Sequence, residues 1–109
     1  MLYHDRIILL GWPEYKAQHQ INYLIELLIK GFSVDTRKCR FIGIGNLHSL
    51  LPQLERKQFP FTKAKRKVRD PVTGTTPINE VLVVWITDEQ RQEWLDRNAD
   101  KRKLRPRKL

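Results

Sequence analysis

The side chains whose type and spacing suggest chemistry are cationic, and they fall into two blocks. The first block, Arg56–Arg69, contains seven lysines and arginines and no acidic residue. The second, Lys101–Lys108, contains six bases and again no acid. A cluster of one sign repels itself, whereas a surface that only needs to be solvated is more stable with mixed charge. The first block therefore predicts a polyanionic ligand, with a plain solvated face as the alternative.

Polar side chains accompany a leucine repeat just before the first block. The segment 47–57 is predicted to form a helix, because its four leucines recur at helical spacing and define a buried stripe. His48, Ser49, Gln53 and Arg56 fall on the opposite face. A glutamine side chain pairs with adenine, and serine or histidine pairs with several acceptors on base edges. These side chains are candidates for reading bases, and an ordinary polar helix surface is the alternative.

Groups for catalysis or metal binding form no recognisable pattern. His4, His19 and His48 lack metal-ligand spacing, and a single cysteine cannot supply a site of two cysteines and two histidines. The segment 43–45 (Gly-Ile-Gly) lacks the lysine and the further glycines of a phosphate loop. No nucleophile, histidine and carboxylate occur in a catalytic order. We expect a protein that is not an enzyme and holds neither metal nor cofactor.

Helices are predicted to position the candidate residues. The first runs from Pro13, which suits the first helical position, to Gly31, which favours a helix end. A short second helix, Val34 to about Arg40, is expected to be N-capped by Ser33. The buried face of the first helix is predicted to comprise Ile21, Leu24, Ile25 and Leu28.

A glycine turn is predicted to lead into the third helix. Gly43 and Gly45 permit the backbone angles of a tight turn, and Asn46 can cap the helix that follows. Pro52 lies inside this helix and removes a backbone hydrogen bond. Either the helix is kinked there, or its regular part begins near Pro52 after a loose first turn.

Strands are predicted at 6–10, 61–68 and 81–86, and the connector between the last two is long for a hairpin. Because strand side chains alternate, Lys63, Lys65 and Lys67 would share one face, with Arg66 and Arg69 on the other face or in the turn.

A last helix is predicted after these strands. Thr87 and Gln90 have the spacing of a capping box and should open the helix. It should run to about Asn98, with Trp94 and Leu95 on its inner side.

Length and composition fit one globular domain. The chain has 109 residues, 40% of them hydrophobic, and a net charge of +9. Its apolar runs are too short to cross a bilayer, and its first residues lack a signal-peptide pattern. One cysteine forms no internal disulfide, which suits a cytoplasmic protein. Cys39 is expected to be a buried structural thiol, although Lys38 and Arg40 beside it would lower the pKa of an exposed one.

The order of these elements resembles the winged helix-turn-helix family, especially its small members encoded by phages and prophages. The similarity runs from about Gln18 to Ile86. It comprises the long helix ending at Lys30-Gly31, the capped second helix, the turn 43–47 and the helix end 54–57 that leads into the basic ribbon. The resemblance implies that the third helix enters the major groove and the hairpin contacts the flanking backbone. Pro52 and the long connector depart from the family's pattern.

The predicted fold is α+β: a winged helix-turn-helix with a three-helix core, a β-hairpin wing, an N-terminal strand and a C-terminal helix over residues 1–99. Residues 100–109 are predicted to be a basic, disordered tail. The expected function is binding of double-stranded DNA, as a small phage-type regulator or an accessory factor in replication or recombination. The candidate DNA-binding residues are Thr36, Arg37, Arg40, Asn46, His48, Ser49, Gln53, Arg56, Lys57, Lys63, Lys65, Arg66, Lys67, Arg69, Lys101, Arg102, Lys103 and Arg105.

Other partners stay open at this point. A protein-interaction module, such as a phage inhibitor of a host complex, would use Trp85, Trp94 and the N-terminal strand to grip an acidic protein surface, since aromatic residues anchor such contacts. RNA is a further option, because lysine-rich ribbons discriminate little between the two nucleic acids. Specific half-sites would require a homodimer or a larger complex, which the sequence does not indicate.

Overall fold

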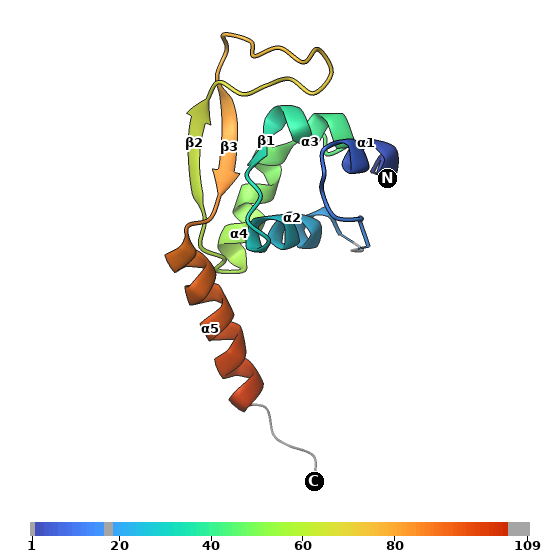
Figure 1. The fold of residues 1–109 in the computed structure, drawn as a ribbon. Coiled ribbons are helices and arrows are strands. Elements are labelled where there is room, and N and C mark those ends of the chain that lie inside the picture. The colour runs from blue at the N-terminus through green and yellow to red at the C-terminus, as the bar shows by residue number, and fades with distance from the viewer. Residues whose placement is uncertain (1, 17–18, 105–109) are drawn as a thin grey trace.

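The computed structural model describes residues 2–16 and 19–104 and confirms the α+β class (Figure 1). Within these residues the chain forms five α-helices, one short 3₁₀ helix and a three-stranded antiparallel sheet with the order β1-β3-β2. In Figure 1, helices α1 to α4 lie to one side of the sheet, and α5 points away from the rest of the molecule.

The N-terminal segment is a helix, so the strand predicted at 6–10 is wrong. Helix α1 (His4–Leu9) buries only Ile7. Gly11, at φ 73°, ends it by letting the Trp12 N–H donate to the Ile7 carbonyl over 3.1 Å. An apolar run of four residues fits a strand or a helix equally well by periodicity alone. Here the backbone of the segment forms helical hydrogen bonds within the segment. The Tyr3 N–H also donates a 2.9 Å hydrogen bond to the Ile42 carbonyl at the end of α3.

Helix α2 (Gln20–Ile29) begins later than the predicted start at Pro13. Pro13 lies outside the helix, and its carbonyl accepts a 2.6 Å hydrogen bond from the Tyr23 hydroxyl. The helix ends at Gly31 as predicted, and its predicted apolar face is buried except for Ile25, which is half-buried.

A two-residue strand precedes the next helix. Strand β1 (Val34–Asp35) pairs with β3, and α3 (Thr36–Ile42) follows it directly. The predicted cap, Ser33, is wrong. Asp35 caps α3 instead, since its carboxylate accepts from the Lys38 N–H at 2.9 Å.

The predicted third helix has two parts. A 3₁₀ helix, η1 (Leu47–Leu50), leads into α4 (Leu51–Arg56), and Pro52 lies in the first turn of α4. The second of the two alternatives for Pro52 is therefore correct, because a proline in a first turn removes no helical hydrogen bond. Asn46 precedes η1, but its side chain makes no cap hydrogen bond. The predicted leucine stripe is buried.

The two longer strands form a hairpin close to the predicted positions. Strand β2 (Thr62–Arg66) pairs with β3 (Val81–Trp85) in antiparallel register, with Lys63 opposite Val84 and Lys65 opposite Leu82. The long connector, residues 67–80, curls over α3 in Figure 1.

Helix α5 (Asp88–Leu104) opens with the predicted capping box. The Gln90 N–H donates to the Thr87 hydroxyl at 3.1 Å, and the Thr87 N–H donates to the Gln90 side chain at 2.9 Å. Trp94 packs on the core, edge-on to Phe59 at 4.8 Å between ring centroids, as predicted. Leu95 is 43% exposed, so its predicted inner position is wrong. The helix passes the predicted end at Asn98, and it includes the first residues of the expected tail; residues 105–109 lie outside the described part.

One apolar core joins the helices to the sheet. Its fully buried side chains include residues of α1, α2, β1, α3, η1, α4 and β3, among them Ile7, Tyr23, Ile42, Leu54 and Val84. No helix in the described part of the chain is long and apolar enough to cross a membrane.

Candidate nucleic-acid interface

The outer side of η1 and α4 carries the side chains predicted to read bases. His48, Ser49 and Arg56 are exposed and Gln53 is half-buried, because the leucine stripe turns the other side of both helices into the core. The Ser49 hydroxyl donates to the Asn46 carbonyl at 2.8 Å, so its oxygen is left as an acceptor. Asn46 is exposed beside it.

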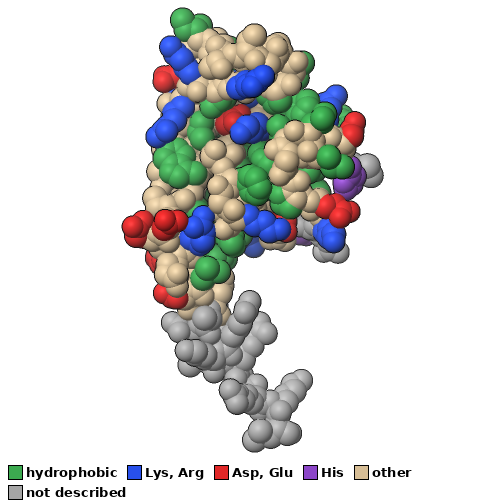
Figure 2. Space-filling model, in the orientation of Figure 1, with side chains coloured by type: hydrophobic (Ala, Val, Ile, Leu, Met, Phe, Trp, Pro, Cys, Tyr) green, Lys and Arg blue, Asp and Glu red, His purple; other side chains and the backbone are tan. Residues whose placement is uncertain are grey.

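Two lysines of β2 lie on the helix side of the sheet. Directly opposite residues share a face of an antiparallel pair. Lys63 therefore shares the face of Val84, and Lys65 that of Leu82, both of which belong to the core. Both lysines are nevertheless exposed, because β2 is an edge strand. In Figure 2, blue side chains lie on the upper part of the edge where β2 is drawn in Figure 1, with green and tan atoms below them.

The basic block makes no ion pair within the described residues. Lys57 follows α4, Lys67 follows β2, and both are exposed. The ion pairs among the described residues are formed by bases outside this block, namely Lys16, Lys30, Arg37, Lys38, Arg91 and Arg97. The cations from Arg56 to Arg69 are thus not neutralised by described carboxylates.

Arg66 is separated from the two lysines by the sheet. It shares the opposite face with Ala64 and Trp85, and its guanidinium lies 4.7 Å from the centre of the Trp85 ring. Val83 on this face is only 6% exposed, and together with Arg66 and Trp85 it lines a shallow hollow. The predicted placement of Arg66 on the other face from Lys63 and Lys65 is confirmed.

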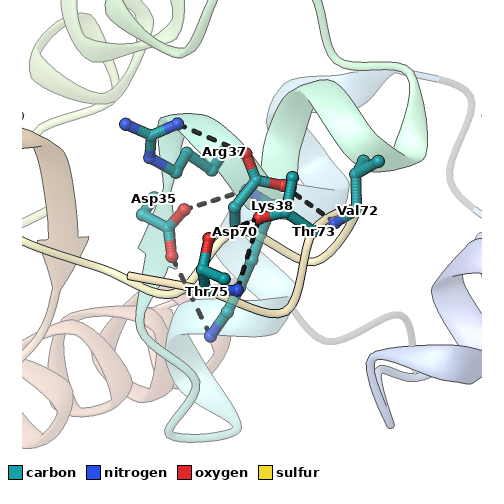
Figure 3. A network of polar contacts seen from close by, with 7 residues as sticks. All are labelled: Asp35, Arg37, Lys38, Asp70, Val72, Thr73 and Thr75. Carbon is teal, nitrogen blue, oxygen red and sulfur yellow. Dashed lines mark hydrogen bonds and ion pairs between the residues drawn. The ribbon is translucent and has the colours of Figure 1, made fainter. Parts of the chain in front are cut away.

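Thr36 and Arg37, expected to contact DNA, make internal contacts instead. The Thr36 hydroxyl donates to the Leu82 carbonyl at 3.5 Å. Arg37 forms a 3.3 Å ion pair with Asp70, and about one fifth of each of these two side chains is exposed (Figure 3). The Asp70 carboxylate also accepts from the Val72 N–H at 2.8 Å. This pair ties the connector to α3.

The remaining candidates lie on other elements. Arg40 is exposed in the last turn of α3. The guanidinium of Arg69 passes 3.5 Å from the point that a Cβ on Gly74 would occupy, so this side chain lies along the connector. Lys101, Arg102 and Lys103 belong to the end of α5, and Arg105 lies outside the described residues.

Asp35 is a buried carboxylate that the sequence did not single out. It is 3% exposed, and its second oxygen lies 3.9 Å from the Lys38 ammonium. Burial raises the pKa of the Asp35 carboxyl above its ordinary value, while the hydrogen bond from the Lys38 N–H and the charges of Lys38 and Arg37 act in the opposite direction. The sequence offered two preferred N-cap residues, Ser33 and Asp35. Because Ser33 was chosen as the cap, Asp35 was placed inside the predicted helix, which began at Val34.

Cys39 is fully buried, as predicted. Burial raises the pKa of its thiol, and the neighbouring carboxylate of Asp35 acts in the same direction. The flanking cations therefore do not activate this thiol.

Of the predicted residues, those of η1 and α4 lie together, because the two helices follow each other directly and pack on one another. Strand β2, with its lysines, follows α4 in the chain after residues 57–61. Comparison with protein-family models, curated proteins and solved structures finds no match for this chain.

Proposed function

We propose that this chain is a winged-helix protein that binds double-stranded DNA and catalyses no reaction. The observation that carries the proposal is the chain order: β1, α3, a glycine turn, η1 with α4, and the β2–β3 hairpin, within a sheet of order β1-β3-β2. In a winged helix, the helix after the turn enters the major groove and the hairpin lies beside it on the backbone. Here that helix is α4.

Charge supports the same surface. Arg56 and Lys57 end α4, and Lys63 and Lys65 follow within a few residues on β2. Because no described carboxylate pairs with them, phosphates would meet these cations without first breaking ion pairs. Phosphate contacts of this kind release counterions and make binding depend steeply on salt.

Only a few side chains would recognise the base sequence of the DNA. Helix α4 is short, so His48 and Ser49 on η1 and Gln53 on α4 would face the bases. The connector is tied to α3 by Arg37 and Asp70, so the strand β2, not the tip of the loop, would act as the wing. We propose a role as a small cytoplasmic regulator or accessory factor acting on DNA.

A double substitution tests the proposal. Lys63→Ala with Lys65→Ala should lower affinity for a duplex of about 30 base pairs almost equally for every sequence, and should flatten the salt slope by about 0.9 for each phosphate that the variant no longer neutralises. The control is Lys30→Ala, which replaces an exposed lysine at the C-cap of α2 that pairs with Glu26 at 3.7 Å. Fluorescence anisotropy at several salt concentrations measures both quantities.

Matched RNA should be titrated beside the duplex. Equal or tighter binding of RNA would replace DNA by RNA as the partner. Duplex affinity and salt slope unchanged in the double variant would remove β2 from the interface, and duplex binding absent from the unsubstituted chain would overturn the proposal.

A further inference from the structure

A second surface lies on another part of the molecule. A hollow of about 430 Å³ is lined by residues of α1, α3 and the connector between β2 and β3. Figure 1 shows this connector curling over α3. The residues that line it are Leu9, Leu10, Lys38, Phe41, Arg69, Pro71 and Gly74. None of the side chains proposed to read bases belongs to it.

Leu9, Leu10, Phe41 and Pro71 make part of the lining apolar. Leu9 is 76% exposed and the neighbouring Ile8 is 74% exposed, on a helix that buries only Ile7. Val72, next to Pro71 on the connector, is 75% exposed. Single exposed apolar residues are ordinary, but several of them next to an apolar hollow favour a binding surface.

The charges at the hollow are positive. Lys38 and Arg69 are its charged lining residues. Lys38 lies 3.9 Å from the buried Asp35 carboxylate, whereas Arg69 makes no ion pair within the described residues. The nearest carboxylate in sequence, Asp70, is held by Arg37. Arg6 adds a further cation beside Phe41, since its guanidinium lies 5.3 Å from the centre of that ring and donates to the Phe41 carbonyl at 3.0 Å.

The connector side of the hollow is preformed. The Asp70 N–H donates to the Thr75 carbonyl at 2.7 Å, and the Gly74 N–H donates to the Asp70 carbonyl at 2.8 Å. Gly74 has φ 73°, a conformation that suits glycine. The Thr73 and Thr75 hydroxyls lie 2.8 Å apart (Figure 3). A surface that is already ordered loses less conformational entropy on binding.

From the apolar lining residues and the cations beside them we infer that an acidic, amphipathic segment of a partner protein docks in this hollow. Its apolar side chains cover Leu9 and Phe41, and its carboxylates approach Lys38 and Arg69. A nucleic acid would leave the leucine side uncovered. A second copy of this chain, at a net charge of +9, would bring mainly like charge to the rim. Docking here does not require that the chain bind DNA.

The probe is a labelled helical peptide of about 16 residues, with leucines at helical spacing on one face and glutamates elsewhere. A scrambled peptide of identical composition controls for charge alone. The full chain should bind the amphipathic peptide more tightly than the scrambled one. Leu9→Asp should weaken that binding about tenfold or more. The substitution removes an apolar side chain from the lining of the hollow and places a negative charge next to the glutamates of the peptide.

The matched control is Ile78→Asp, which is 78% exposed on the same connector but outside the hollow. It should leave peptide affinity unchanged. Circular dichroism checks that both variants fold, and Leu9→Ser provides a milder change at the same exposed site.

Four results would overturn the inference. The first is equal binding of the scrambled peptide, and the second is equal loss of affinity in the two aspartate variants. The third is loss of peptide binding in the Lys63→Ala, Lys65→Ala protein, which would place the peptide on the proposed DNA surface. A dimer seen by sedimentation that Leu9→Asp dissociates would make a second copy the occupant instead.

Discussion

Asp35, which the sequence did not single out, and Arg37, which was expected to contact DNA, both stabilise the fold at α3. Asp35 caps the helix, and Arg37 holds the connector through Asp70. The partners in the second pair are 33 positions apart, so no local pattern in the sequence reveals the contact. The cations of α4 and β2 were easier to predict, because an acid-free block is visible in the sequence itself.

Asp35→Ala should lower the free energy of unfolding by about 1–2 kcal/mol, because it removes an N-cap. Asp35→Asn should cost less, since its side-chain oxygen still accepts from the Lys38 N–H. Urea unfolding followed by tryptophan fluorescence gives both values. A larger loss in Asp35→Asn than in Asp35→Ala would contradict the capping role.

The same carboxyl gives a pH dependence with a definite sign. Because burial raises the pKa of Asp35 above the ordinary 3.8, the folded state binds the proton more tightly than the unfolded chain. The stabilisation that the folded protein gains from a protonated Asp35 is fully present below the pKa of the unfolded chain. It is lost as the pH rises through the raised pKa of the folded protein. The difference in unfolding free energy between the unsubstituted protein and Asp35→Asn should therefore shrink or reverse as pH rises over that range. A difference that grows with pH would contradict the raised pKa.

At the scale of elements, strong local signals predicted type and position, and weak ones did not. The Thr87–Gln90 capping box, the leucine stripe and the two strands of the hairpin are found close to where the sequence places them. The strand predicted at 6–10 is wrong, because four consecutive apolar residues are too few to show whether the period is that of a helix or of a strand. The predicted start of α2 at Pro13 is wrong, because proline suits the start of a helix but also suits the non-helical segment in which Pro13 lies.

The end of α4 carries a strained residue. Gln58 has φ 56°, a left-handed conformation that costs a side-chain-bearing residue roughly 1–2 kcal/mol. Gln58→Gly should relieve this strain and, after the greater entropy of glycine in the unfolded chain, raise the unfolding free energy by about 0.5–1 kcal/mol. Lys57→Gly is the control, because Lys57 has φ −81° and gains nothing from glycine. Denaturant midpoints compare the two, and stabilisation by Lys57→Gly instead would be the opposite of this expectation.

The whole molecule divides into a packed body and a helix that extends from it. The described contacts between α5 and the body are made early in the helix. They include Trp94 on Phe59, the Arg91 side chain on the Ile29 carbonyl at 2.8 Å, and the Arg97 side chain on the Gln58 carbonyl.

Removal of residues 99–109 should therefore change the thermal midpoint little. It removes six bases and one acid, so the net charge falls from +9 to +4. If the proposed DNA binding holds, affinity should fall and the salt slope should flatten, in proportion to the phosphate contacts that this segment makes. Calorimetry and anisotropy measure the two effects separately. A large drop in midpoint would show that the end of α5 stabilises the body.

Strand β2 forms an open edge of the sheet, with its outer backbone groups unpaired by any described strand. Such an edge invites another chain to add a strand, and lysines along it oppose this through charge. Lys63 and Lys65 therefore suit two purposes, attraction of phosphate and resistance to aggregation. Replacing them with threonine or valine, which favour strands, would test whether the chain can lose its charge there and still remain monomeric in concentrated solution.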